Sequence, residues 1–279
     1  MTYRNLLVHL DDRKASAKRL EAAIALAQDQ EAHLTGLYLG WPFSFQGYYE
    51  AQIPREVLEQ RRADEQKGVA AAKARFESAT GKAGLAAEWR YEDANAGDPL
   101  EILSLHARYA DLIVLGQREP ETARSVANLT EEVIMTCGRP ALVVPYVGAG
   151  KTLGTRPLIA WDGGREAARA VSDALPLLTK AKQTTLVTVT RRAGKGAHGE
   201  QPGADIALYL ARHGVKVEVQ NLTRGNLTVA DMILSRISDL SSDLLVMGCY
   251  AHSRLRELIL GGVTRQMMAE MTVPLLMAH

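Results

Sequence analysis

The stretch NLLVHLDDRKASAKRLEAAIALA, residues 5–27, consists of a short apolar run, two aspartates and a helical pattern of apolar residues. The same design returns at residues 156–178 as RPLIAWDGGREAARAVSDALPLL. An apolar run that leads through a turn into an amphipathic helix is typical of the first strand and helix of a parallel α/β fold. The sequence therefore predicts that the chain contains this unit twice.

Two further pairs of segments extend the repeat. YADLIVLGQ at 109–117 corresponds to SSDLLVMGC at 241–249, and GRPALVVPY at 138–146 corresponds to MTVPLLMAH at 271–279. Three matches in the same order indicate an internal duplication. Between the copies, VGAGKTLGTR is glycine-rich and polar, as linkers are. We expect two domains, residues 1–147 and 156–279.

Short apolar runs alternate with helical patterns through both copies. Runs that are apolar throughout, such as DLIVLG, are typical of parallel strands buried on both faces, with helices as the crossovers. The expected fold class is α/β: two tandem doubly wound domains, each a five-stranded, mainly parallel sheet flanked by helices. The predicted strands are 5–10, 33–39, 86–92, 111–116 and 141–145, then 157–161, 184–190, 215–220, 243–248 and 273–278.

Composition and charge exclude several classes of protein. The 279 residues include 33 Lys plus Arg and 32 Asp plus Glu, a net charge of +1, which gives no overall attraction to nucleic acid or to an anionic membrane. The two cysteines, Cys137 and Cys249, form no CxxC pattern and predict neither a disulfide framework nor a zinc site. We find no secretory signal and no membrane-spanning run, and expect a cytoplasmic protein.

The stretch MGCYAHSRLRELILGGVT, residues 247–264, carries the most chemistry. In an open parallel sheet, ligands bind beyond the carboxyl ends of the strands. Gly261 and Gly262 can expose backbone N–H groups to an anion at the start of a helix, and His252 and Arg254 add donors. The same glycines are equally compatible with a tight helix entry. Neither the P-loop pattern nor G-x-G-x-x-G is present.

This stretch resembles the signature of the universal stress protein family. There, a glycine ends the fourth strand, a second glycine follows three residues later, and Gly plus Ser or Thr follow after nine more. Here Gly248 matches the first position and Gly261 the third, while Ala251 and Gly262 replace the second glycine and the hydroxyl residue. The resemblance extends over both copies, as a tandem protein.

The resemblance implies a stress-response protein that binds ATP or a related adenylate, with or without magnesium, in its second domain. Asp162 and Val189 would face the adenosine, Gly248 the ribose, and the backbone of Ala251, Gly261 and Gly262 the phosphates. His252, Arg254 and Thr264 would compensate for the missing donors. The cofactor-binding residues expected are therefore Asp162, Val189, Gly248, Ala251, His252, Arg254, Gly261, Gly262 and Thr264.

The first domain departs further from the family pattern. After Gly116, Glu119 replaces the second glycine and Leu129-Thr130 replace the last pair. Glu119 and Glu121 would repel phosphate. We expect a degenerate loop that binds no nucleotide in the family's manner.

No catalytic or metal-binding residues are indicated, because paired carboxylates, metal-ligand spacing and a nucleophile elbow are not found in the sequence. At most, slow ATP hydrolysis is expected. The alternative is a non-nucleotide scaffold or small-ligand-binding protein with degenerate sites. Its surface would include the aromatic segment WPFSFQGYY, 41–49, which could bind an apolar ligand or a protein, or cover its own domain's core.

Two purely structural interpretations remain open. Asp162 is equally compatible with a helix cap, and Cys249 with a small buried apolar residue at a strand end.

In the family the fifth strands of two domains usually meet, which would join 141–145 to 273–278 as a pseudo-dimer. A homodimer of the whole chain is also compatible with the sequence.

Overall fold

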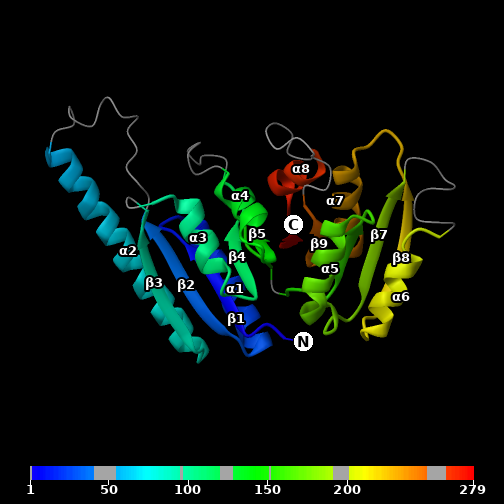
Figure 1. Cartoon of the computed structure of the whole chain (residues 1–279), viewed down its shortest axis with the longest axis horizontal. Coiled ribbons are helices and arrows are strands. Elements are labelled where there is room, and N and C mark those ends of the chain that lie inside the picture. The colour runs from blue at the N-terminus through cyan, green and yellow to red at the C-terminus, as the bar shows by residue number, and fades with distance from the viewer. Residues whose placement is uncertain are drawn as a thin grey trace.

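The structure is a computed structural model that describes residues 2–40, 55–94, 97–119, 128–150, 152–190, 201–249 and 262–279. Strands and helices alternate along both halves of the chain (Figure 1). The first half contains β1 (Asn5–Leu10), α1 (Lys14–Gln30), β2 (His33–Gly40), α2 (Arg55–Ala83), β3 (Ala87–Asp93), α3 (Pro99–Ala107), β4 (Leu112–Gly116), α4 (Leu129–Thr136) and β5 (Ala141–Val144). The second contains β6 (Pro157–Trp161), α5 (Arg165–Leu178), β7 (Thr184–Thr190), α6 (Ala204–Arg212), β8 (Val217–Thr223), α7 (Val229–Leu240), β9 (Leu244–Gly248), α8 (Gly262–Glu270) and β10 (Leu275–Ala278).

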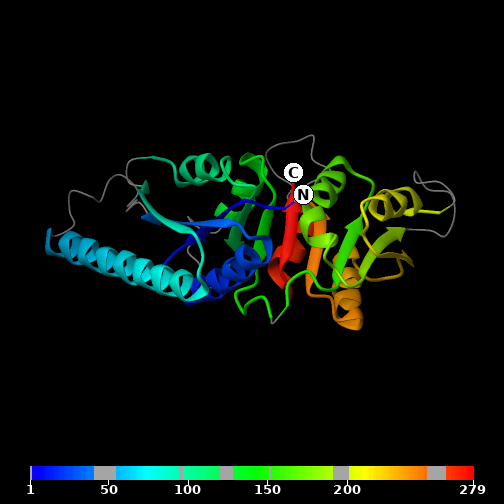
Figure 2. The same cartoon turned by 90° about the horizontal axis from the view of Figure 1, so that it is seen from below.

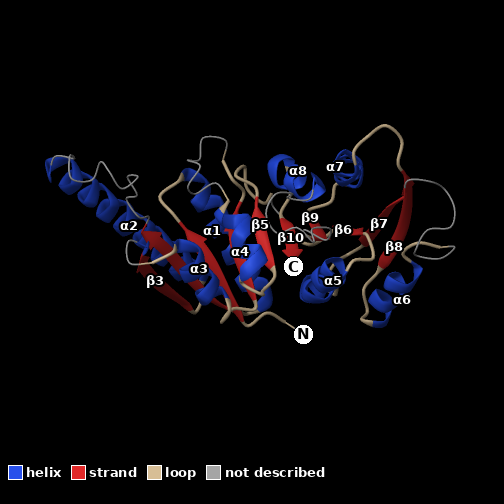
Figure 3. Cartoon of the chain, turned by 45° about the horizontal axis from the view of Figure 1, so that its top comes forward, coloured by secondary structure: helices blue, strands red, loops and turns tan. Residues whose placement is uncertain are grey.

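The strands form one continuous sheet with the order β3-β2-β1-β4-β5-β10-β9-β6-β7-β8 (Figure 3). Within each half the neighbouring strands are parallel and the order reverses beside the first strand, as in a doubly wound fold. The halves join where β5 and β10 pair antiparallel, with Leu142 opposite Leu276. The predicted fold class and the predicted meeting of the fifth strands are therefore confirmed.

Helices cover both faces of the sheet (Figure 2). One face packs against α1, α2, α5 and α6, through residues such as Leu26, Phe76, Val171 and Leu210. The other packs against α3, α4, α7 and α8, through residues such as Leu103 and Met267. Burial on both faces explains why the central strands are apolar throughout. None of the helices in the described ranges is both long and apolar enough to cross a membrane.

The observed strands begin or end within three residues of the predicted ones. β8 starts at Val217 rather than at residue 215, because Val215 still belongs to the end of the preceding helix. Its N–H donates to the carbonyl oxygen of Leu210 at 3.0 Å, and Gly214 before it turns the chain with φ 80°. An apolar residue in a helix-ending turn has the same sequence appearance as the first residue of a strand.

Two equivalent aspartates fix the start of the central strands. The Asp111 carboxylate accepts hydrogen bonds from the backbone N–H groups of Arg4 and Asn5, before and at the start of β1. In the second half, Asp243 accepts from the N–H groups of Thr155 and Arg156, just before β6. These contacts tie β1 to the start of β4 and β6 to the start of β9, and thereby set which residues meet at the opposite, carboxyl edge.

Candidate functional site

Three of the predicted site residues meet at the carboxyl edge of the second half. Trp161, the last residue of β6, lies opposite Thr188 of β7, and Ala160 lies opposite Met247 of β9. Asp162 therefore follows β6 at the level where Val189 nears the end of β7 and Gly248 ends β9. Parallel strands bring these residues together although they are far apart in the sequence.

The Asp162 side chain is exposed and lies at the turn between β6 and α5. Its Oδ1 accepts a hydrogen bond of 2.8 Å from the N–H of Gly164, the N-cap residue of α5. Gly164 is itself the N-cap of α5 and no side chain caps this helix, so the prediction that Asp162 caps it was wrong; the aspartate orders the turn before the helix instead. Among the described residues no cation pairs with the carboxylate, so its other oxygen is available at the sheet edge.

Gly248 allows α5 to approach the end of β9. A Cβ atom at this position would lie 2.4 Å from the backbone nitrogen of Ala167 and 2.6 Å from the carbonyl carbon of Glu166. Real Cβ atoms do not approach backbone so closely, and only glycine fits here. Gly248, which the resemblance predicts to contact a ribose, therefore has a packing role at the end of β9.

The structure also describes the surroundings of Gly262, Thr264 and Val189, but not those of the other predicted site residues. Gly262 is the first residue of α8, and no atom of the described residues lies within 4 Å of the position of an added Cβ. Thr264 is buried in the first turn of α8, and Val189 packs against the core on the α7 and α8 face. The remaining predicted residues, Ala251, His252, Arg254 and Gly261, lie outside the described residues, as does the aromatic segment 41–49.

The equivalent edge of the first half is closed by its own side chains. Arg19 of α1, 6% exposed, donates from Nη2 to Oδ2 of Asp11 at 2.8 Å. Its Nη1 lies 2.6 Å from where a Cβ of Gly116 would be. The Thr130 hydroxyl donates to the carbonyl oxygen of Gly116 at 3.0 Å. Asp11 thus has a cationic partner, and Asp162 has none within the described ranges.

Burial and charge set the ionisation of this closed edge. Burial would raise the pKa of Asp11, but the Arg19 guanidinium outweighs it, and the pKa is lowered. Burial lowers the pKa of neighbouring His9 to about 3, with the positive charge of Arg19 as the second cause. Asp11 is therefore a carboxylate and His9 a neutral imidazole at pH 7.

Sequence reasoning missed Arg19 and Gln117. In the sequence, Arg19 cannot be distinguished from a polar residue on the solvent-exposed face of an amphipathic helix. Gln117, directly after β4, donates from Nε2 to the carbonyl oxygens of Met268 and Ala269, each at 3.1 Å, and accepts from the N–H of Tyr146 at 3.2 Å. A first-half side chain thus caps the end of α8 in the second half, a long-range contact without a local signal.

The cysteine at the end of β9 carries no reactive thiol. Cys249 is fully buried, and its Sγ donates to the carbonyl oxygen of Ala278. Burial raises the pKa of this thiol to about 12, so the nucleophilic thiolate is absent at pH 7. Its predicted role as a small buried residue is confirmed. In the described part of the chain no cluster of His, Cys, Asp or Glu has the arrangement of a metal site.

The sheet order and the strand-end residues define a tandem, doubly wound α/β protein. A model of the universal stress protein family matches the chain twice, over residues 2–145 and 155–279. The chain therefore belongs to the universal stress protein family and contains its domain in tandem.

A curated universal stress protein of Synechocystis sp. is 32% identical over 175 residues, which are 60% of this chain and 57% of that protein. The match thus spans less than two thirds of the relative's length. A universal stress protein structure from Archaeoglobus fulgidus has a TM-score of 0.72 at 17% identity, covering 98% of this chain and 97% of its own. One from Pseudomonas aeruginosa has a TM-score of 0.57 at 15% identity, covering 99% and 93%. At these identities the two structures support the fold only.

Proposed function

We propose that the second half of the chain binds ATP or a related adenylate at the carboxyl edge of β6, β7 and β9, with little or no catalysis. Asp162 and Val189 would contact the adenosine and Gly248 the ribose. The phosphates would lie toward the start of α8, where the N–H groups of a helix N-terminus and its dipole favour an anion.

The observation that carries the proposal is the difference between the two halves. α8 has no acidic residue in its first turn, whereas the equivalent α4 has Glu131 and Glu132. The carboxylate of Asp162 has no cation beside it among the described residues, whereas Asp11 is paired with Arg19. An incoming phosphate and ribose therefore meet fewer competing groups in the second half.

Calorimetric titration with ATP and with AMP, with and without magnesium, tests the proposal. Mass spectrometry of the purified protein first checks for nucleotide carried through purification. We expect one nucleotide per chain. An absence of both heat and carried nucleotide would favour the alternative, a protein whose strand-end sites are both degenerate.

Two substitutions at one position sharpen the test. No described atom lies within 4 Å of a Cβ added at Gly262, so we expect Gly262→Glu to leave the described packing intact. Its carboxylate interacts favourably with the helix dipole, yet it repels phosphate. We expect it to weaken ATP binding at least tenfold. Gly262→Ser restores the hydroxyl of the family pattern and is expected to strengthen binding. The matched control is Asn128→Glu, which adds the same charge at the N-cap of α4 and should leave ATP affinity unchanged.

A further inference from the structure

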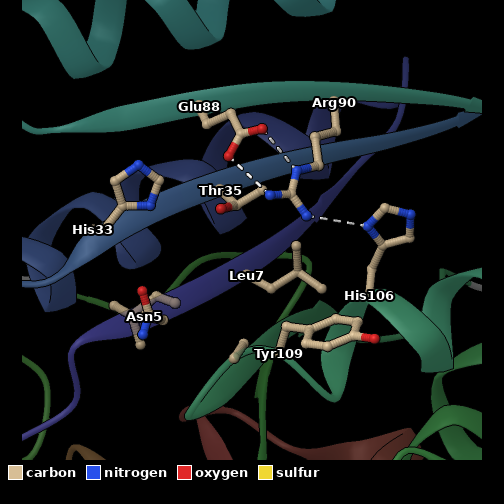
Figure 4. A pocket seen from close by; sticks show the side chains of 10 residues that line it. Asn5, Leu7, His33, Thr35, Glu88, Arg90, His106 and Tyr109 are labelled. Atoms are coloured by element: carbon tan, nitrogen blue, oxygen red, sulfur yellow. Dashed lines mark hydrogen bonds and ion pairs between the residues drawn. The ribbon is translucent and has the colours of Figure 1, made fainter.

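A pocket lies in the first half, at the amino ends of β1, β2 and β3 and beside the end of α3 (Figure 4). Its volume is about 310 Å³, at the small end of the range for small-molecule sites. It opens at the edge of the sheet opposite to the strand ends discussed above. Its floor is apolar, with Leu7 and Ala110, and its walls are mostly polar: His33, Thr35, Glu88, Arg90, His106 and Tyr109.

Contacts with two side chains orient Arg90 in the pocket wall. Its Nε and Nη2 donate to the two carboxylate oxygens of Glu88, both at 2.9 Å. Its Nη1 lies 3.4 Å from Nδ1 of His106. Because arginine has no acceptor, Nδ1 of His106 is the acceptor in this contact, and Nε2 of the same ring lies 3.3 Å from the Glu92 carboxylate. A side chain fixed in this way loses little conformational entropy on binding a ligand.

Two donors of Arg90 remain for a ligand. An arginine has five N–H groups, and the contacts above use one each of Nε, Nη1 and Nη2. The remaining two belong to the terminal nitrogens, and among the described residues neither has a partner. Figure 4 shows that this end of the guanidinium faces Thr35 and Leu7, inside the pocket. The pocket thus presents a fixed, planar pair of donors.

The charges and the rim restrict the class of ligand. Glu88 and Glu92 flank Arg90 and would repel a carboxylate or a phosphate. A neutral ligand with two adjacent acceptors receives both donors without this repulsion. At the rim, Tyr109 is 74% exposed, which leaves a ring face free for stacking. The ligand indicated is flat, uncharged and equipped with an edge of two acceptors.

We propose that this pocket binds an oxopurine base, whose O6 and N7 acceptors pair with the two free N–H groups of Arg90 while its ring stacks on Tyr109. Arginine recognises the same edge of guanine in nucleic acids. An adenine base offers a donor at position 6 and is rejected. The site is separate from the nucleotide site proposed for the second half and does not depend on it.

Calorimetry of the whole chain with guanosine, inosine and adenosine tests this proposal. Guanosine and inosine are expected to bind at one site. Arg90→Lys keeps the charge but removes the planar pair of donors, and is expected to weaken guanosine binding at least tenfold. Tyr109→Ala should weaken it too, while adenosine affinity is unchanged in both variants. The control Arg212→Lys, at an exposed position of α6, should leave guanosine affinity unchanged.

Three results would overturn the proposal. The first is an absence of guanosine binding at millimolar concentration. The second is guanosine binding that neither Arg90→Lys nor Tyr109→Ala weakens, which would assign the ligand to another site. The third is benzoate, a carboxylate probe, binding more tightly than guanosine and depending on Arg90, which would make the pocket an anion site.

Discussion

The two equivalent strand-end glycines should tolerate alanine very differently. In Gly248→Ala the new methyl group would lie 2.4 Å from the Ala167 nitrogen, so α5 itself has to move. In Gly116→Ala the nearest atom, at 2.6 Å, is Nη1 of Arg19, the far end of a flexible side chain. The same substitution thus meets backbone in one half and a movable group in the other.

The magnitudes follow from these contacts. Overpacking a well-packed site costs typically about 1–3 kcal/mol, and a rigid backbone neighbour favours the upper end. Neither glycine has a positive φ, so alanine also reduces the entropy of the unfolded chain, a gain of about 0.4–1 kcal/mol. We expect Gly248→Ala to lower the free energy of unfolding by about 2 kcal/mol, and Gly116→Ala to lower it by less than about 1 kcal/mol.

Urea unfolding followed by far-UV circular dichroism measures both variants. Gly262→Ala serves as the control, because no described atom lies within 4 Å of the added methyl group, and the entropy gain alone should raise the free energy of unfolding by about 0.4–1 kcal/mol. If Gly116→Ala proves as destabilising as Gly248→Ala, the close approach of α5 to β9 is not what requires glycine at the strand end.

Three further predictions concern buried polar groups. Gln117→Leu removes the cap of α8 and the acceptor of Tyr146, and should lower the free energy of unfolding by about 1–3 kcal/mol; an unchanged urea midpoint would contradict this. The pKa of His9 is lowered to about 3 by burial, so only the unfolded chain takes up this proton as the pH falls below about 6.5. Stability should therefore fall from pH 6.5 toward pH 4, and less steeply in His9→Asn; parallel pH profiles would refute this. Cys249, with its pKa raised to about 12 by burial, should react with iodoacetamide at pH 8 only after unfolding, which peptide mass spectrometry detects.

The sequence was sufficient to predict the fold because the decisive signals are local. Each central strand is a largely apolar run of four to six residues, and each first helix follows an aspartate at the same distance. Period and turn chemistry therefore predict the strands, and the repeat predicts two sheets of equal design. The start of β8 shifted because the apolar residue Val215 belongs to a turn, and the strand also extends three residues beyond its predicted end, to Thr223.

The candidate sites were predictable only in part. The convergence of Asp162, Val189 and Gly248 follows from parallel topology, because all three end or follow neighbouring strands. The pairing of Arg19 with Asp11 does not follow from the topology, because it depends on the distance between α1 and β4. The guanosine pocket combines the edge strand β3 with the end of α3, and no sequence pattern connects these elements.

The distance between the first helix and the fourth strand accounts for the different state of the two strand edges. In the first half a guanidinium lies between α1 and Gly116, and it neutralises the aspartate that follows β1. In the second half the backbone of α5 lies directly against Gly248, which leaves no space for such a side chain. Ala170, at the position equivalent to Arg19, is fully buried in the core instead. The tighter packing of α5 is therefore the reason why no cation from the helix after β6 pairs with Asp162 as Arg19 pairs with Asp11.

We expect that the two proposed ligands, guanosine and the adenylate, do not compete for one site. The guanosine pocket lies at the amino edge of the first half, and the adenylate site at the carboxyl edge of the second, so neither ligand can contact the other's residues. Guanosine affinity measured by calorimetry in saturating ATP should stay within about twofold of its value without ATP, a difference below about 0.4 kcal/mol. Competition would mean that guanosine enters the second-half site. A larger change without competition would mean that the halves are coupled, and Gln117, which joins β4 to the end of α8, is the contact to remove first.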